Sequence, residues 1–350
     1  MASNSLLDML EEGVSYGLDG LKLMIYGGNN IGKTPQAMRF PKPLLLMGET
    51  GGSALKGYKK HMTSKKVFVD YVKQLTDEKT LDQMKEKFQT IVLDCVEDII
   101  ELFEIALCKE YGVKDVGEIQ QLEKGNPNGY SVARRDFKQQ INLLTGCGYT
   151  VIFIAHEETI QIPTGENDEK GNAITRDFIQ PKGSKGDKSS SRFIRDLCDF
   201  RFYIVSSGFD KETNKVIMSK AWCVQTDAFF AGSRFNVKPL INPFTAENII
   251  EAIEEAQKKT AEDYGADLVA FERKTDSYTK EDYLSDIKPY MTKLYKLYPS
   301  LVLDIVSSQL GSGVPVSKAT DEQLVELETI YTKLVDLAMD RGIYVDTNEE

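Results

Sequence analysis

Histidine and cysteine, the residues that most often bind zinc, are scarce in this chain of 350 residues. The two histidines, His61 and His156, are too few for a histidine cluster, which excludes most zinc hydrolases. The five cysteines are scattered and form no CxxC pair: they are Cys95, Cys108, Cys147, Cys198 and Cys223. This pattern is typical of reduced thiols in a cytosolic protein, and we expect neither a disulfide framework nor a zinc site.

Long apolar runs are also missing. The strongest run, VIFIA at 151–155, has the length of a strand, whereas a membrane span needs roughly 18–20 residues. The first twenty residues are acidic where a secretory signal would be basic. We therefore expect a cytoplasmic protein with no membrane partner.

The net charge of −11 is unevenly distributed along the chain. Residues 1–245 hold 32 Lys and Arg against 32 Asp and Glu, whereas residues 246–350 hold 11 against 22. This shift predicts a boundary near 245, followed by an acidic extension with a helical pattern. A solvated helical surface explains the acidity; a lid, an oligomerisation element or a dock for a partner are alternatives.

Apolar runs alternate with helical patterns over the first 200 residues. Strands are expected at 21–26, 44–47, 67–72, 90–94 and 149–155, and helices at 76–88, 96–111 and 130–145. Continuous apolar strands that alternate with helices indicate an α/β fold with a mainly parallel sheet. Later runs at 201–205, 216–224 and 229–235 predict a β-hairpin at the sheet edge, and helices are expected at 245–259, 279–298 and 320–341.

A glycine-rich phosphate loop follows the first strand. The stretch fits GxxxxGK[ST] and comprises Gly27, Gly28, Asn29, Asn30, Ile31, Gly32, Lys33 and Thr34. In such a loop the backbone N–H groups surround the phosphates, the lysine reaches the β- and γ-phosphates, and the threonine hydroxyl binds Mg²⁺. The strand before the loop and the helix after it are the expected context, so the sequence predicts nucleotide binding.

Three polar residues end other strands of the predicted sheet. Asp94 is expected to hold Mg²⁺ through water, although it could also cap the next helix. Glu49 could activate water at the γ-phosphate, or simply stand in a turn. His156 could sense the γ-phosphate, although a single histidine often has only a structural role.

A basic stretch runs from 176 to 195. Its glycines and serines predict a mobile loop that suits a phosphate backbone, with a solvated loop as the alternative. The candidate DNA-binding residues are Arg176, Lys182, Lys185, Lys188, Arg192 and Arg195.

The runs KLMIYGGNNIGKT, FPKPLLLMGETGG, TIVLD, VIFIAHEE and AGSRF resemble the phage nucleotide-binding ATPases of the RecA-like class, which include single-strand-annealing recombinases. The resemblance covers roughly residues 15–240. It implies a RecA-like P-loop NTPase core with a helical C-terminal extension, and ATP and Mg²⁺ as cofactors. Lys33, Glu49 and His156 then take catalytic roles, with Asp94 as the Walker B aspartate.

The resemblance further implies a homo-oligomer, as a ring or a filament, in the cytoplasm of the host. Arg234, or alternatively Lys220, would then present a cation to the nucleotide of a neighbouring subunit, and a surface ion pair is the alternative for Arg234. The partners implied are single-stranded DNA and a single-strand-binding protein, in annealing or strand exchange. A nucleotide-gated assembly protein and a P-loop kinase are the competing functions.

Overall fold

The computed structural model describes residues 11–49, 55–119, 129–183, 192–273, 279–320 and 323–345. The chain divides into two compact units, Met1–Arg273 and Lys274–Glu350. Each unit has its own buried apolar cluster, and each is described separately below.

A nine-stranded sheet, counted over the described residues, forms the centre of the first unit. Its order is β12-β10-β9-β2-β6-β5-β3-β4, with β11 paired to β9. The strands are β2 (Lys22–Gly27), β3 (Pro43–Met47), β4 (Tyr58–His61), β5 (Thr90–Asp94), β6 (Thr150–Ala155), β9 (Phe200–Val205), β10 (Lys220–Trp222), β11 (Gly232–Ser233) and β12 (Leu240–Ile241). Each neighbouring pair from β9 to β4 is parallel, which confirms the α/β fold with a largely parallel sheet.

The apolar runs form central strands because helices cover both faces of the sheet. All six residues of β6 and the last five of β2 are buried. Strands buried on both faces read as continuous apolar runs rather than alternating ones. This is why the strands at 22–27, 43–47, 90–94 and 150–155 were predicted within a residue or two.

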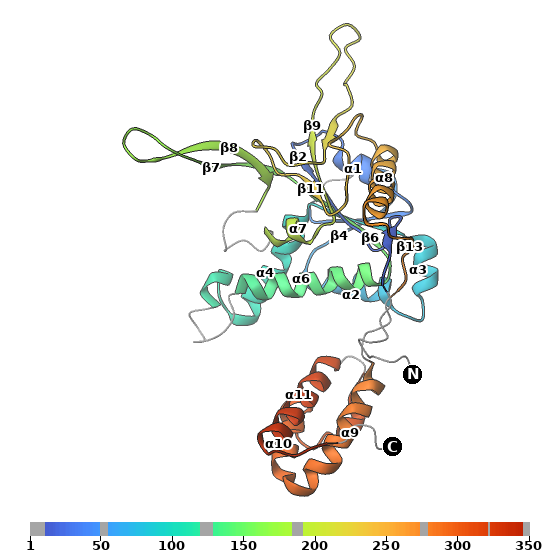
Figure 1. Cartoon of the computed structure of the whole chain (residues 1–350), viewed down its shortest axis with the longest axis vertical. Helices are drawn as coiled ribbons and strands as arrows, with labels where there is room; N and C mark the ends of the chain where they lie inside the picture. The colour runs from blue at the N-terminus through green and yellow to red at the C-terminus, as the bar shows by residue number, and fades with distance from the viewer. Residues whose placement is uncertain are drawn as a thin grey trace. The chain divides into compact units, whose positions relative to one another are not determined.

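Three helices pack on one face: α2 (Lys65–Thr76), α4 (Val96–Tyr111) and α6 (Gly129–Gly146) (Figure 1). Their rings meet edge to face, with centroids 5.7 Å apart for Phe68 and Phe103 and 5.4 Å apart for Phe103 and Phe137. These contacts hold α2, α4 and α6 together against the sheet.

The expected strand at 67–72 was wrong, because these residues lie within α2. Its buried residues Phe68, Val72 and Leu75 recur at helical spacing. Ser64 caps the helix by accepting a hydrogen bond from the N–H of Val67. Packing of one helix face thus outweighs the strand preference of valines and aromatics. The helix expected at 76–88 is in fact the end of α2 and a separate α3 (Leu81–Lys87).

The opposite face is covered by α1 (Lys33–Ala37) and α8 (Ala246–Tyr264). Ile249 and Ile253 of α8 are fully buried in the same cluster as β2 and β9. The side chain of Gln36 accepts a hydrogen bond from the N–H of Ala246 at 2.9 Å, which joins the two helices.

The division expected near 245 therefore shifts to 273. The first acidic residues after 246 lie outside the buried side of α8, while its apolar side belongs to the core of the first unit. Beyond α8, β13 (Leu268–Ala270) pairs in parallel with β1 (Val14–Tyr16), which also ties this segment to the first unit.

Two hairpins extend from the sheet (Figure 1). One consists of β7 (Glu157–Asn167) and β8 (Ala173–Pro181), paired antiparallel. The other is the expected edge hairpin, since β10 pairs antiparallel with β9. Its second strand is shorter than the predicted 216–224, and only the bridge between Phe209 and Val216 pairs further out.

The second unit contains α9 (Lys280–Leu297), α10 (Pro299–Leu310) and α11 (Leu324–Asp340) around a small apolar core. The capping box of Thr279 and Asp282 begins α9. Helix α10 was missed, because its Pro299 fits both a break and the first turn of a helix. Two 3₁₀ turns, Val116–Glu118 and Val316–Lys318, complete the elements. Across the described residues, every helix is too short or too polar to cross a membrane.

Candidate functional site

The phosphate loop joins β2 to α1 in a conformation that depends on its glycines. Gly32 has a φ of 93° directly before the helix, and Gly27 has a φ of 151°. A Cβ at Gly27 would clash with the carbonyl oxygen of Ile204 on β9, so only glycine fits. Pro35 lies in the first turn of α1, where its missing N–H costs little.

Lys33 folds back over the loop that precedes it. Its Nζ donates to the carbonyl oxygens of Gly27 at 2.7 Å and Gly28 at 2.6 Å. Burial lowers the pKa of Lys33 from its ordinary value, against the opposing effect of nearby acids led by Asp94. Phosphate oxygens can replace the two carbonyls as partners, so the ammonium is already placed for a nucleotide.

The side chains expected to hold Mg²⁺ are in direct contact. Thr34 Oγ1 donates to Asp94 Oδ2 at 2.6 Å. Burial raises the pKa of Asp94, opposed by the Thr34 hydrogen bond. A hydroxyl and a carboxylate at the end of a parallel strand are oxygen ligands of the kind Mg²⁺ prefers, so these two residues fit the ion.

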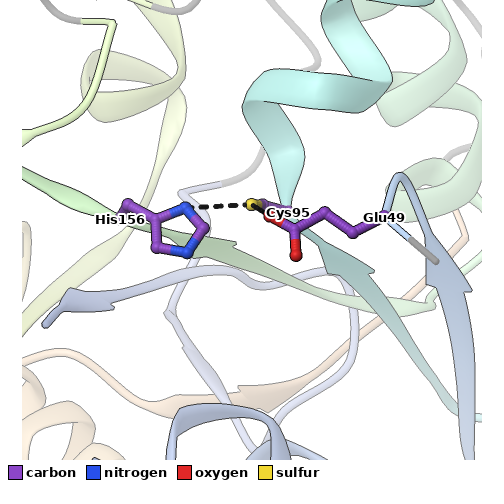
Figure 2. Close-up of side chains that lie close together, drawn as sticks. All are labelled: Glu49, Cys95 and His156. Carbon is purple, nitrogen blue, oxygen red and sulfur yellow. Dashed lines mark hydrogen bonds between the residues drawn. The ribbon is translucent and has the colours of Figure 1, made fainter. Parts of the chain in front are cut away.

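Glu49, Cys95 and His156 come together beside this pair. They follow β3, β5 and β6, whose carboxyl ends meet at one edge of the sheet, as Figure 2 shows for the side chains. Cys95 Sγ lies 3.2 Å from Glu49 Oε1 and 3.2 Å from His156 Nδ1. Burial raises the pKa of the Cys95 thiol. The sequence placed Glu49 and His156 at this edge but gave no reason to expect Cys95 between them.

Glu97 is a further residue of the site that the sequence did not reveal. Its Oε1 accepts from the backbone N–H of His156 at 3.1 Å and lies 2.8 Å from His156 Nδ1. This hydrogen bond raises the pKa of His156 above its ordinary value. Glu97 lies in the first turn of α4, three residues after Asp94, and this position is the signal that could have indicated it.

A cavity of about 570 Å³ lies against the phosphate loop. It is bordered by Gly27, Gly28, Asn29, His156, Glu157 and Lys182. Lys182 was expected to bind DNA, but here it borders the nucleotide site. Its backbone N–H donates to the carbonyl oxygen of His156 at 2.8 Å, so β8 returns the chain directly to the proposed sensor.

The edge hairpin also touches the phosphate loop. Ser219 is buried, and its hydroxyl donates to the carbonyl oxygen of Ile31 at 2.9 Å. The next residue, Lys220, pairs with Val205 at the same edge of the sheet. Lys220 therefore lies near its own phosphate loop.

Arg234 lies at the amino-terminal end of β9, at the opposite end of the parallel strands from the phosphate loop. Its backbone N–H donates to Asp199, which precedes β9, and its guanidinium forms an ion pair with the same residue at 3.1 Å. The ion pair named as the alternative is thus present. Its own phosphate loop is at the far end of β2, so Arg234 lies away from the nucleotide site of its own chain.

The expected mobile loop at 176–195 was wrong at both ends. At its start, the residues up to Pro181 belong to β8. At its end, the residues from Arg192 onward form the short helix α7 (Arg192–Leu197). Strand pairing with β7 fixes the stretch up to Pro181, while the serines lie among residues 184–191, outside the described residues.

The expected basic residues divide into separate groups. Arg176 forms an ion pair with Asp227, and Arg195 with Asp196. The hairpin around Arg176 is acidic, with six Asp and Glu against two Lys and Arg over 157–181. Lys185 and Lys188 lie outside the described residues, as does the side chain of Arg192.

Comparisons with known proteins agree with this geometry. The family described as AAA domain matches residues 19–235, which contain the phosphate loop and every strand end named above. The SPbeta prophage-derived uncharacterized protein YorG of Bacillus subtilis (strain 168) is 32% identical over 337 residues, which is 93% of this chain and 95% of that protein. With a family match over more than half of its length and a phosphate loop built for a nucleotide, this chain belongs to the AAA domain family of P-loop ATPases.

Proposed function

We propose that the chain is a Mg²⁺-dependent ATPase of the RecA-like type that acts on single-stranded DNA. The observation that carries the ATPase part is the meeting of Lys33, Thr34, Asp94, Glu49 and His156 at the carboxyl edge of one parallel sheet. Ligands of α/β proteins bind at this edge.

Each side chain has a distinct task in hydrolysis. Lys33 exchanges the loop carbonyls for phosphate oxygens, and Thr34 and Asp94 hold Mg²⁺, which neutralises charge on the phosphates when bound. Glu49 is placed to accept a proton from the attacking water. His156, fixed by Glu97, changes its contacts when the γ-phosphate leaves.

DNA binding is assigned to the segment that begins at the nucleotide cavity. Residues 182–195 hold five Lys and Arg against one Asp. The segment starts at Lys182, whose backbone N–H donates a hydrogen bond to the carbonyl oxygen of His156. A change at His156 when the nucleotide is hydrolysed can therefore be passed directly to the DNA-binding segment. Lys182 borders the nucleotide cavity, so four cations remain for DNA; neutralising four phosphates of a single strand predicts that affinity falls roughly 50-fold between 50 and 200 mM salt.

The biological role that fits these properties is annealing or strand exchange in phage recombination, by a homo-oligomer with Arg234 acting between subunits. The prophage origin stated in the name of the Bacillus subtilis relative supports the setting. The side chain of Arg234 is 55% accessible, so its guanidinium can exchange the ion pair with Asp199 for a neighbour's nucleotide.

Phosphate release from Mg-ATP, with and without single-stranded DNA, tests the proposal. We expect several-fold stimulation by DNA that is lost at high salt, and no release from Lys33→Ala. Replacing both Lys185 and Lys188 by glutamine should lower the slope of log DNA affinity against log salt concentration by about 1.4. The same change at Lys211 and Lys215, exposed in the edge hairpin, is the matched control and should not alter it.

A rate of phosphate release that single-stranded DNA does not change would contradict the proposed DNA binding but leave the proposed ATPase activity standing. A nucleotide-dependent change in oligomeric size would then favour the assembly protein, and phosphate transfer to a small acceptor would favour the kinase.

A further inference from the structure

Three side chains at the nucleotide edge form a set of ligands that does not suit magnesium. Glu49, Cys95 and His156 offer a carboxylate oxygen, a sulfur and a ring nitrogen, all within 4.8 Å of one another (Figure 2). The scattered cysteines exclude a site built from paired thiols, but here three strand ends far apart in sequence bring one thiol to a histidine and a carboxylate.

The surroundings of Cys95 favour a cation. Its sulfur carries one proton, yet it lies near Glu49 Oε1 at 3.2 Å, His156 Nδ1 at 3.2 Å and Asp98 Oδ2 at 3.7 Å. The single thiol proton can be donated to only one of the two carboxylates, Glu49 or Asp98. Sulfur, imidazole and carboxylate together are ligands of Zn²⁺ and similar ions, whereas Mg²⁺ selects oxygen alone.

Glu97 supplies independent support. Its side chain is only 9% accessible, and one oxygen holds His156 at 2.8 Å. The other oxygen, Oε2, is buried without a hydrogen-bond partner among the described residues. A buried carboxylate oxygen left unpaired is costly unless something positive satisfies it. A metal on His156 Nδ1 would take the place of the proton that Glu97 Oε1 accepts there, so the Glu97 carboxylate would become a fourth ligand.

The distances need little adjustment to accept the ion. Zinc–sulfur and zinc–nitrogen bonds of about 2.3 and 2.0 Å place the two atoms roughly 3.5 Å apart in a tetrahedral site. Cys95 Sγ and His156 Nδ1 are 3.2 Å apart, so they must separate by only a few tenths of an ångström.

We propose that Glu49, Cys95 and His156 bind a zinc-class divalent ion, with Glu97 completing the site, and that this ion inhibits hydrolysis. Binding occupies Glu49 and His156, so neither can act on water or phosphate. The inhibition rests on the proposed ATPase function, whereas the metal binding does not.

Cobalt binding tests the site without any nucleotide. The full-length chain is titrated with Co²⁺, whose thiolate complexes have a characteristic absorption band that Zn²⁺ abolishes on displacement. We expect one Co²⁺ per chain with this band, its loss in Cys95→Ser, and its retention in Cys108→Ser, which changes a half-buried cysteine of α4, the helix that Cys95 precedes. Absence of the band in the wild-type chain, or an unchanged band in Cys95→Ser, overturns the proposal.

Inhibition is measured separately, as the rate of Mg-ATP hydrolysis against Zn²⁺, each variant relative to its own zinc-free rate. We expect at least tenfold less sensitivity in Cys95→Ser than in Cys108→Ser. Equal sensitivity refutes the inhibition. A chain that shows the cobalt band but hydrolyses nothing refutes the ATPase function and leaves the metal site standing.

Discussion

Replacing Ile253 by alanine tests whether α8 is a structural part of the ATPase unit. Ile253 is fully buried in the same apolar cluster as side chains of β2 and β9. If the acidic C-terminal region were a separate extension from 246 onward, this change would leave the sheet unaffected. The structure instead predicts that the whole first unit loses stability.

The expected loss follows from burial. Removing the larger part of a fully buried isoleucine side chain costs roughly 2–5 kcal/mol, from lost transfer energy and the cavity left behind. A loss of about 3 kcal/mol is a large share of the 5–15 kcal/mol that typically stabilises a protein. With a urea dependence of about 3 kcal/mol per molar, the unfolding midpoint falls by about 1 M.

The single tryptophan of the chain gives a specific assay. Trp222 lies on β10 beside Phe229, so its fluorescence in urea follows the first unit. Glu251→Ala, on the exposed side of the same helix, is the matched control and should shift the midpoint little. An unchanged midpoint for Ile253→Ala would refute the assignment of α8 to this unit.

Three further predictions concern the site. Ser219→Ala removes the hydrogen bond to Ile31, worth about 1 kcal/mol, and should weaken ATP binding about fivefold by calorimetry with the fold unchanged by circular dichroism. In the metal-free protein, Asp94→Asn should raise the melting temperature at pH 8, because the buried Asp94 carboxylate has a raised pKa and is destabilising when charged. The same substitution should abolish the rise in melting temperature that Mg-ATP gives the unchanged protein. The pKa of His156 is raised in the folded state, so its pairing with Glu97 stabilises the fold fully below about pH 6.5 and is lost as the pH rises through the folded pKa. Glu97→Gln should lower that pKa by NMR titration and flatten the pH dependence of unfolding; an unmoved pKa would contradict the assigned contact.

Much of the candidate site could be predicted from the sequence because its parts are local. The phosphate loop is one continuous stretch, and Asp94, Glu49 and His156 each directly follow a short apolar run. In a parallel sheet such positions meet at one edge, whatever the order of the strands. Alternation of buried runs and helices was therefore enough to place them together.

The residues that the sequence missed are those whose roles depend on a neighbour far along the chain. Glu97 and Cys95 carry no pattern of their own and acquire their contacts only when β5 and β6 pair. Lys182 was grouped with a basic loop by composition, but pairing of β7 with β8 brings it back to the nucleotide cavity. Charge composition alone could not separate residues that face DNA from those that face a nucleotide or an acidic partner.

The sequence by itself determined the buried strands and the phosphate loop, since apolar runs and glycine spacing act through local backbone geometry and burial. Only the tertiary structure decided that 67–72 is helical, that α8 belongs to the first unit, and which side chains surround Cys95. These outcomes depend on packing between segments distant in the chain, whose energies exceed local preferences.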